Sequence, residues 1–579
     1  MKSERNPYLI GKAMKYYLIA SILSTIVVQL NVIVDGIIVG HCVSPDALSA
    51  VNLYSPISLA LVSIGSLLGA GATVLAARAI GGRDMQKASQ FLSTALSSLI
   101  VVGFVVAVVF LLFHDSIVEL VSKEERLNTY FVDYMLIMGC FGVTGMLSSF
   151  LGLSVEVDGN PRLVTLAQSI AAITNIILDV VLVGFADCGI QGAAWASVIS
   201  TIVAIVIMYR HFLDSQCLVR MKIFQNCTFK AFSANLQQGL PLIAGNAILM
   251  LLIFFLNTIV MDMQGADGMF VLSVCISLLT IGMLFANGIG SMVLSVGGFL
   301  NGQKDFSGLR MLVNRGIGIL LGFTLVIMVV VEIAPGFFVS IYGAENADLI
   351  AYAAASLRVF IIALPSFLMV LLMANEFQML GYLVLVPTVV ALLPLLLFPC
   401  MYIFTSLWGA SCVWYAFPCA GVLVIAFILI ATEIIRSRKR NVTHFTLIPQ
   451  DTSECFFNVS IENNTVSMGR HLKALIEKMS EKGIAADLIF NISLCAEETI
   501  LNIIQHAYKD KAEYYIDIMA VIHEGKLTLS VKDNGRPYNP LSQSKDMRGI
   551  GLTLVSNACP EIDYKYMYGQ NMAYFTWMI

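Results

Sequence analysis

Apolar runs long enough to cross a bilayer recur along most of this chain, from about residue 14 to about residue 435. A helix needs roughly 20 apolar residues to span the hydrocarbon core of a membrane. Charged residues make up only 12% of the 579 residues, about half the share that is typical of soluble domains. The sequence therefore predicts an α-helical polytopic membrane protein, with twelve spans centred near residues 27, 62, 101, 140, 173, 201, 249, 280, 322, 365, 392 and 422.

Basic residues between these runs predict the orientation. If the N-terminus is cytoplasmic, the outer segments hold only Lys123, Arg126 and Arg358. The inner segments then hold Lys2, Arg5, Lys12, Lys15, Arg78, Arg83, Lys87, Arg162, Arg210, Arg220, Lys222, Lys230, Lys304, Arg310, Arg315, Arg436, Arg438, Lys439 and Arg440. This asymmetry is what the positive-inside rule requires. We expect a multi-pass protein of the plasma membrane, in contact with lipid, with both termini in the cytoplasm.

The composition changes after the basic segment 436-RSRKR-440, and residues 441–579 have the polarity of a soluble domain. The basic segment is interpreted as a stop-transfer anchor on an anionic leaflet, with lipid sensing as the alternative. No run of basic and aromatic residues indicates a nucleic-acid surface. The twelve cysteines are scattered, without a CxxC pair, so the sequence predicts neither disulfides nor a zinc site.

Three polar residues lie inside the predicted spans. Asp35 interrupts an apolar run, and Asn175 and Asp179 are four residues apart, so that they share one face of a helix. Ionisable groups at membrane depth usually mark a pathway, and oxygen ligands suit a hard cation. A structural alternative is that Asp35 caps a break at Gly36 and that Asp179 reaches water at the outer interface.

Three segments resemble the MATE (multidrug and toxic compound extrusion) transporters: 31-NVIVDGIIVGHCVSPDALSAVNLYSPI-57, 158-DGNPRLVTLAQSIAAITNIILDVVLVGF-185 and 189-GIQGAAWASVIS-200. The resemblance implies two six-helix lobes, an N-lobe at 1–225 and a C-lobe at 226–440. It also implies a cation site in the N-lobe, formed by Asp35, Asn175, Asp179 and Ser197, with Na+ or H+ as the coupling ion.

An internal repeat restricts that site to one lobe. When Gly409 is aligned with Gly192, Leu392 falls at the position of Asn175 and Leu396 at that of Asp179. The polar pair is therefore expected in the N-lobe alone. The spans are rich in Met, Phe and small residues, which would suit a small-molecule substrate such as an amphipathic organic cation or a lipid; helix packing explains the same composition.

The C-terminal domain carries an ordered set of polar motifs. Glu498, Asn502 and His506 are spaced four residues apart on the amphipathic helix predicted at 487–508. The turn 533-DNGRP-537 closes a strand, and 548-RGIGL-552 can form a backbone cradle for phosphates. We also expect a strand at 444-HFTLIP-449 and a helix near 468–482.

This set resembles the Bergerat-fold (GHKL) ATPases, and most closely the anti-sigma-factor serine kinases. The resemblance implies an α/β sandwich that binds ATP and Mg2+. Glu498 would be the general base, Asn502 the Mg2+ ligand, Asp533 and Gly535 the adenine site, Gly549 and Gly551 the phosphate loop, and Arg548 a charge on the phosphates. His506 would be either a contact near the nucleotide or a satisfied helix residue.

Two functions follow from these resemblances. The first is a cation-coupled efflux transporter whose ATP-binding domain regulates transport or signals. The second is a membrane-anchored serine/threonine kinase that uses the transporter half as a sensor and acts on a small anti-anti-sigma-like protein. A primary pump ranks last because the chain has no G-x4-G-K-[ST] loop, and a degenerate domain that binds no nucleotide is the structural alternative.

Overall fold

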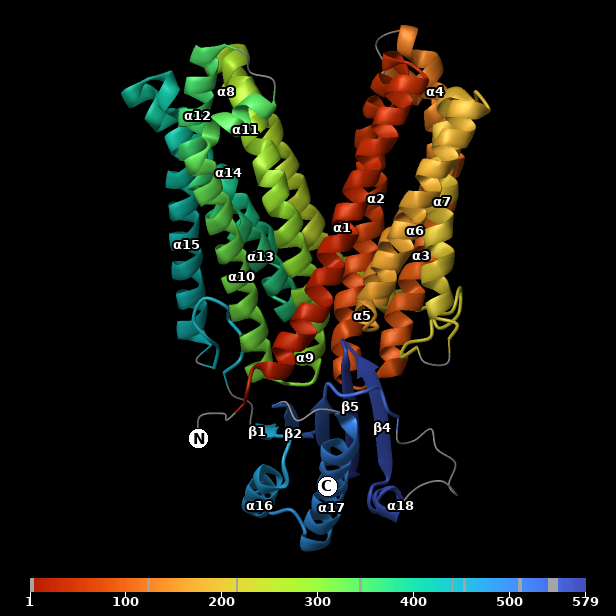
Figure 1. Ribbon diagram of the computed structural model, residues 1–579, viewed down its shortest axis with the longest axis vertical. Helices are drawn as coiled ribbons and strands as arrows, with labels where there is room; N and C mark the ends of the chain where they lie inside the picture. Colours follow the sequence, from red (N-terminus) through yellow and green to blue (C-terminus); the bar gives the residue numbers. More distant parts are fainter. Residues whose placement is uncertain are drawn as a thin grey trace.

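Hydropathy divides this chain into two structurally different parts. The computed structural model describes residues 5–121, 125–214, 217–342, 346–439, 441–450, 454–508, 513–539 and 550–579. Long helices occupy the apolar part, and the described C-terminal part is a five-stranded sheet with three α-helices and a short π-helix (Figure 1). A membrane helix satisfies its own backbone hydrogen bonds, which is why the apolar part is helical almost throughout.

The first group of helices extends from residue 8 to residue 211. Its elements are α1 (Tyr8–Cys42), α2 (Pro45–Gly81), α3 (Met85–Val121), α4 (Glu125–Cys140), α5 (Gly142–Val157), α6 (Pro161–Asp179), the π-helix η1 (Val180–Phe185) and α7 (Gly189–His211). Helices α4 and α5 meet at a bend of 48° and form one broken span. Proline at the first turn of α2 and of α6 begins both helices without the loss of a hydrogen bond.

The second group extends from residue 229 to residue 438. Its elements are α8 (Phe229–Met292), the π-helix η2 (Val293–Gly297), α9 (Gly298–Gly302), α10 (Phe306–Ile333), α11 (Pro335–Ile341), α12 (Ala347–Ile361), α13 (Leu364–Leu380), α14 (Leu385–Trp408), the 3-10 helix η3 (Ala410–Tyr415) and α15 (Ala416–Arg438). Gly265 has a non-helical backbone (φ 62°, ψ −148°) and divides α8 into two arms.

The described helices agree with the predicted number of spans. Nine are long and apolar enough to cross a membrane, and the two bent pairs raise that number to eleven. One of these spans, 229–302, has the break at Gly265 near its middle. If its two arms are counted separately, the described part of the chain holds twelve spans, near the positions that the sequence predicts.

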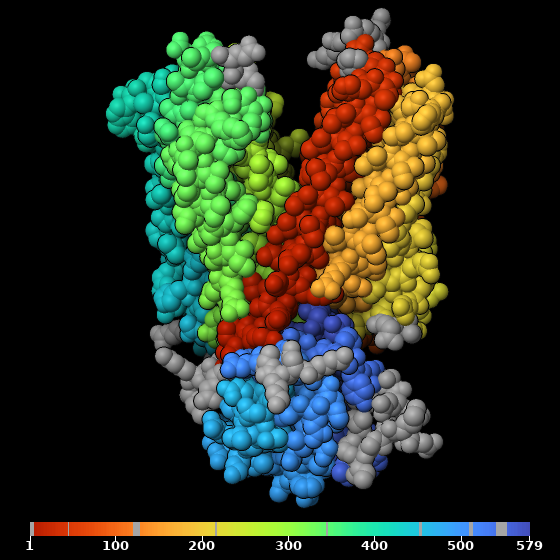
Figure 2. Space-filling view, viewed as in Figure 1, coloured from red at the N-terminus to blue at the C-terminus, as the bar shows by residue number. Residues whose placement is uncertain are grey.

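The two groups of helices meet at the end that bears the C-terminal domain, here called the domain-side end. They diverge toward the opposite, open end, where the space-filling view is hollowed between them (Figures 1 and 2). At the domain-side end α2 crosses α8 so closely that a Cβ atom added to Gly71 would lie 2.0 Å from the carbonyl oxygen of Asn235. Glycine is required at this crossing because any side chain would separate the two helices.

Two equivalent turns reveal the internal repeat at the domain-side end. Arg83 and Lys304 both adopt a left-handed backbone, with φ of 65° and 63°. The next residue in each turn caps the following helix, because Asp84 Oδ1 accepts from the Lys87 N–H and Asp305 Oδ1 accepts from the Gly308 N–H. The turns 81–84 and 302–305 therefore occupy matching places in the two groups.

The C-terminal part is an antiparallel sheet in the order β1-β2-β3-β5-β4, with helices on one face. The strands are β1 (Cys455–Glu462), β2 (Tyr515–His523), β3 (Lys526–Asp533), β4 (Glu561–Met567) and β5 (Gln570–Met578). The helices are α16 (Thr465–Glu481), α17 (Ala486–Asn502), the π-helix η4 (Ile503–Ala507) and α18 (Ile550–Ala558). Strand residues alternate between the two faces, so Leu527, Leu529 and Val531 join the core beneath the helices.

The predicted strand at 444–449 is wrong. This segment forms turns closed by an isolated bridge between Val442 and Pro449, and the first strand begins at Cys455. Phe445 and Leu447 have φ of 62° and 53°, which no extended strand allows. Leu447 and Ile448 are instead buried in the core of the helical part.

Candidate functional sites

The first candidate site lies among α1, α6 and α7. Asn175 and Asp179 are 1% and 0% exposed on the buried face of α6. The Asn175 side-chain N–H donates to Ser197 Oγ of α7 over 3.5 Å. Asp35 of α1 interacts with Asp179. The structure therefore brings together the four residues that the sequence analysis named.

The oxygens of this cluster are buried without protein donors. Among the described residues, none donates a hydrogen bond to either carboxylate oxygen of Asp179, to Asp35 Oδ1 or to Asn175 Oδ1. Buried polar atoms are normally paired, so an orphaned set of oxygens points to a cation or a proton as the missing partner. Asp179 is also the last α-helical residue before the π-helix η1, and such π-turns are frequent at functional sites.

Sequence reasoning missed two tyrosines at this cluster. Tyr134 of α4 interacts with both Asp35 and Asp179. Its ring packs edge-on against that of Tyr54 of α2, with 5.5 Å between the centroids. No spacing in the sequence connects these residues to Asp35, because they come from separate helices.

The C-lobe differs from the N-lobe as the repeat alignment predicts, with one addition. Leu392 and Leu396 are buried and half-buried apolar residues of α14. However, Glu376 of α13 is fully buried, and no described residue donates a hydrogen bond to its carboxylate oxygens. An acidic residue inside the run 371-LLMANEFQML-380 was the signal in the sequence.

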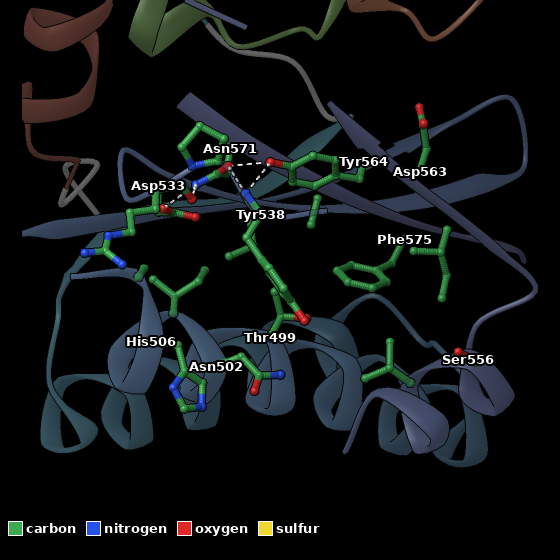
Figure 3. A pocket seen from close by; sticks show the side chains of 18 residues that line it. Thr499, Asn502, His506, Asp533, Tyr538, Ser556, Asp563, Tyr564, Asn571 and Phe575 are labelled. Carbon is green, nitrogen blue, oxygen red and sulfur yellow. Dashed lines mark hydrogen bonds between the residues drawn. The ribbon is translucent and has the colours of Figure 1, made fainter. Parts of the chain in front are cut away.

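The second candidate site is a cavity of about 390 Å³ between the sheet and α17 of the C-terminal domain (Figure 3). Its sheet side carries Asp533, Tyr564 and Asn571, and Tyr538 points from there toward the helix. Most of its exposed wall surface is apolar, and polar groups converge on it, as is usual for a small-molecule site. The full lining is Thr499, Asn502, Ile503, His506, Ala507, Val531, Asp533, Arg536, Pro537, Tyr538, Val555, Ser556, Ile562, Asp563, Tyr564, Asn571, Ala573 and Phe575.

Asp533 is the acceptor at the centre of the sheet side. It is 4% exposed, and its Oδ1 accepts from the Gly535 N–H (2.7 Å) and from the Asn571 side-chain N–H (2.9 Å). Burial raises the pKa of Asp533 to about 6, against the opposing effect of these two hydrogen bonds. A buried carboxylate with capacity for another donor can recognise an amino group on a flat heterocycle.

Gly535 holds this acceptor in place by close packing. A Cβ atom added at Gly535 would lie 2.6 Å from Ala507 Cβ and 2.8 Å from the Ala507 carbonyl oxygen. The Arg536 N–H donates to the same carbonyl over 3.2 Å. The turn after β3 is thus fastened to the end of η4, which is the far wall of the cavity.

The helix side of the cavity agrees with the predicted motif in part. Asn502 and His506 both line it, together with Thr499. Asn502 is the last α-helical residue before η4. Glu498 is half-buried on α17 and is not among the residues that line the cavity. Its assignment as a general base therefore stays a prediction.

The predicted phosphate loop lies mostly outside the described residues, since Arg548 and Gly549 are both outside them. Gly551 lies in the first turn of α18, whose N-terminal amides would suit an anion. Sequence reasoning missed Asn571, which reaches the site because β5 pairs with β3 and places Asn571 opposite Asp533. No local sequence motif identifies a residue that lies opposite on a neighbouring strand.

Comparisons with known proteins agree with both parts of the chain. A family model described as MatE matches residues 20–181 and 241–403. A model described as a histidine kinase-like ATPase domain matches residues 462–577.

Two curated relatives are multidrug proteins. The multidrug export protein MepA of Staphylococcus aureus (strain MSSA476) is 24% identical over 220 residues, which are 38% of this chain and 48% of MepA. The probable multidrug resistance protein YoeA of Bacillus subtilis (strain 168) is 25% identical over 204 residues, 34% of this chain and 44% of YoeA. The chain thus spans about half the length of the curated relatives it matches.

Solved structures share the fold of the helical part. An outward-facing multidrug resistance MATE family transporter of the MOP superfamily has a TM-score of 0.67 at 20% identity, over 76% of this chain and 100% of that one. A MATE crystal structure in the bent conformation has a TM-score of 0.68 at 20% identity, over 74% and 96%.

Proposed function

The chain belongs to the MatE family, and from this premise we propose that it exports small molecules from the cell in exchange for Na+ or H+. The observation that carries the proposal is the buried cluster of Asp35, Asn175 and Asp179, whose oxygens lack protein donors. A cation or a proton bound there satisfies those oxygens. Its release changes how α1 packs against α6, and this couples the ion to the shape of the cavity between the lobes.

The substrate and the orientation are parts of the same proposal. MepA is named a multidrug export protein, and we infer that the substrate here is likewise an amphipathic small molecule, such as an organic cation. The basic inner segments favour a cytoplasmic domain-side end, where the C-terminal domain meets ATP. The open end then faces outward.

We propose that the C-terminal domain binds ATP and regulates transport. The amino group of adenine would donate to Asp533, and the apolar lining would cover the ring. The side-chain oxygens of Asn502 and Thr499 are ligands that suit Mg2+ next to phosphates, so Asn502 would hold the metal.

Transport in proteoliposomes tests the cation site. With ethidium as the probe and an imposed Na+ or pH gradient, we expect Asp35→Asn to reduce efflux at least about tenfold. Asp262→Asn, the same change at an exposed position of α8, should leave efflux unchanged. Normal efflux by Asp35→Asn would refute the assignment, and the gradient that drives efflux identifies the ion.

Nucleotide experiments separate regulation from kinase activity. ATP binding to the full chain supports the regulatory proposal, and transfer of labelled phosphate to an anti-anti-sigma-like protein would establish the kinase function instead. We expect Glu498→Gln to abolish any such transfer. If Glu498→Gln stops efflux as well, ATP turnover is required for transport.

A further inference from the structure

The C-terminal domain contacts both lobes through one face of its sheet. On the N-lobe, Arg83 pairs with Glu561 over 3.0 Å and hydrogen-bonds to Thr576. On the C-lobe, the Lys532 ammonium donates to Gln303 over 2.7 Å. Arg83 and Gln303 belong to the equivalent turns 81–84 and 302–305. The sheet therefore bridges the same feature of both lobes across their seam.

The turn between β4 and β5 inserts at that seam. Tyr568 and Gly569 form a two-residue turn with φ of 53° and 74°. Such turns favour Asn-Gly, because a bulky residue in the left-handed region is strained. Tyr568 is nevertheless held there, 1% exposed. The strain indicates that its buried position is stabilised by its surroundings.

Tyr568 contacts both lobes at once. Its hydroxyl donates to the Val157 carbonyl at the end of α5 over 3.2 Å. Its ring lies 6.1 Å from that of Tyr17 of α1 and 6.0 Å from that of Phe299 of α9. Gln570, the first residue after the turn, donates to the Leu9 carbonyl over 2.6 Å.

Buried charges fix the docked position beside this turn. Arg5 pairs with Asp305 and, over 3.2 Å, with Asp517 of β2, and Lys532 lies 3.8 Å from Asp305. All four side chains are at most 4% exposed. Although burial opposes ionisation, Arg5 and Lys532 hold the pKa of the Asp305 carboxyl well below its usual range. Moving the domain would leave these charges unpaired, and buried unpaired charges are costly.

We propose that the docked domain is a latch that holds the domain-side ends of the two lobes together, stabilises the state that is open at the opposite end, and is weakened by adenine nucleotide. A state that opens at the domain-side end requires the lobes to part there. The contacts of Tyr568 with Val157 and Phe299 cannot survive that movement. The effect of nucleotide on the latch rests on the proposed ATP-binding function, whereas the mechanical role of the docked domain does not.

The sheet itself connects the cavity to the latch. Adjacent residues of a strand face opposite sides, so Asp533 lines the cavity while Lys532 faces Gln303. In the same way Asn571 lines the cavity, and its neighbour Gln570 holds Leu9. An adenine ring whose amino group donates to Asp533 comes into contact with the Asn571 side chain, which lines the same cavity and also accepts from the Tyr538 N–H. Movement of Asn571 displaces the end of β5 that carries the inserted turn.

Hydrogen exchange of the full chain in lipid nanodiscs tests the latch. The readout is the crossing of α2 and α8 at 66–72 and 236–242, which the inserted turn does not form. We expect Tyr568→Ala to raise exchange there about tenfold. Phe490→Ala, which removes a similar ring that is 68% exposed on α17, should change it less than about twofold.

A second pair of variants avoids a large change of volume. Asp305→Asn keeps the helix cap and removes the charge that Arg5 and Lys532 need, so we expect the same rise in exchange. Asp84→Asn makes the identical change in the equivalent turn, where the side chain pairs with Lys87, and should have no such effect. If hydrogen exchange at the α2–α8 crossing is the same in Tyr568→Ala and Asp305→Asn as in Phe490→Ala and Asp84→Asn, the latch proposal is wrong.

A separate measurement tests whether nucleotide weakens the latch. ATP with Mg2+ should raise exchange at the crossing in the wild-type chain and not in Asp533→Asn. If equilibrium dialysis shows that ATP binds but wild-type exchange does not change, the nucleotide-weakened latch is wrong. If no ATP binds, the proposed nucleotide function is wrong. The two variant–control pairs still test whether the docked domain holds the lobes together.

Discussion

Asp533 shows how a single buried carboxyl group lowers the stability of a domain. Its carboxyl group is buried beside apolar side chains, and burial raises its pKa from 3.8 to about 6. A raised pKa in the folded state means that ionisation opposes folding. The penalty is absent below pH 3.8, grows between pH 3.8 and 6, and is complete above pH 6. Retaining an acid here costs stability at neutral pH, which a binding role explains.

The substitution Asp533→Asn should therefore stabilise the C-terminal domain. The rise in pKa from 3.8 to about 6 corresponds to about 3 kcal/mol, an upper limit for the gain at pH 7.5. We expect the free energy of opening of β3 and β5, measured by hydrogen exchange of the full chain, to increase by about 1–3 kcal/mol. The gain should shrink as the pH falls from 6 toward 4, and nucleotide binding should be lost.

The same change from carboxyl to amide at Glu477 provides the control for this prediction. Glu477 is exposed on α16 and does not line the cavity. Glu477→Gln should leave the opening free energy of β3 and β5 within about 0.5 kcal/mol of the wild type. A stabilisation by Asp533→Asn that is equally large at pH 4 would contradict the role of ionisation.

At the scale of elements, both candidate sites lie where an α-helix passes into a π-helix. Asp179 precedes η1, and Asn502 precedes η4. A π-turn widens the helix and re-aims the side chains beside it. In the C-terminal domain, η4 also receives the turn after β3, because Gly535 packs on Ala507. The cavity thus depends on the contact between two irregular segments.

Substitution of Gly535 by alanine should break that contact. The added Cβ would approach Ala507 Cβ to 2.6 Å and the Ala507 carbonyl oxygen to 2.8 Å, and a backbone atom cannot yield as a flexible side chain can. We expect a loss of about 1–3 kcal/mol in the stability of the domain and at least tenfold weaker ATP binding by equilibrium dialysis. Gly469→Ala, at an open position of α16, should be neutral or slightly stabilising. Unchanged ATP binding by Gly535→Ala would refute this account.

At the scale of the whole molecule, the two lobes are joined at one end and separate at the other (Figure 1). The joint depends on glycines of α2 and α8, since a Cβ at Gly71 or Gly239 would lie 2.0 Å or 1.8 Å from a backbone oxygen of the other helix. The C-terminal domain covers this joint from outside the membrane part. Closure of the domain-side end therefore has two supports, a helix crossing and a docked sheet.

Alanine at the crossing should weaken the first support alone. We expect Gly71→Ala to cost about 1–3 kcal/mol, seen as a lower midpoint of thermal unfolding in detergent, and to raise exchange at the domain-side end. Gly318→Ala, in α10 with no atom within 4 Å of the added Cβ, is the matched control. If both variants unfold at the same temperature, the glycine crossing does not hold the lobes together.

Much of the architecture could be predicted from patterns that depend only on residues close together in the sequence. Span length and hydropathy predicted the membrane helices, of which the described residues hold twelve when the two arms of 229–302 are counted separately, because a bilayer imposes a similar length on every span. Four-residue spacing placed Asn175 with Asp179, and Asn502 with His506, because helical periodicity depends on sequence separation alone. The strand expected at 444–449 was an exception, because Leu447 and Ile448 pack against membrane helices instead.

The tertiary structure alone decided how the two parts of the chain meet. Tyr134 beside Asp35 and Asp179, Asn571 beside Asp533 and the burial of Tyr568 between the lobes all join residues that are far apart in the sequence. Their contacts depend on helix packing, strand register and domain docking, and none of these leaves a periodic signal in the chain. The sequence by itself determined a membrane transporter fold with an ATPase-like domain. Only the folded structure decided that the domain is docked across the joint of the lobes, because docking depends on the shape and charge of two assembled surfaces.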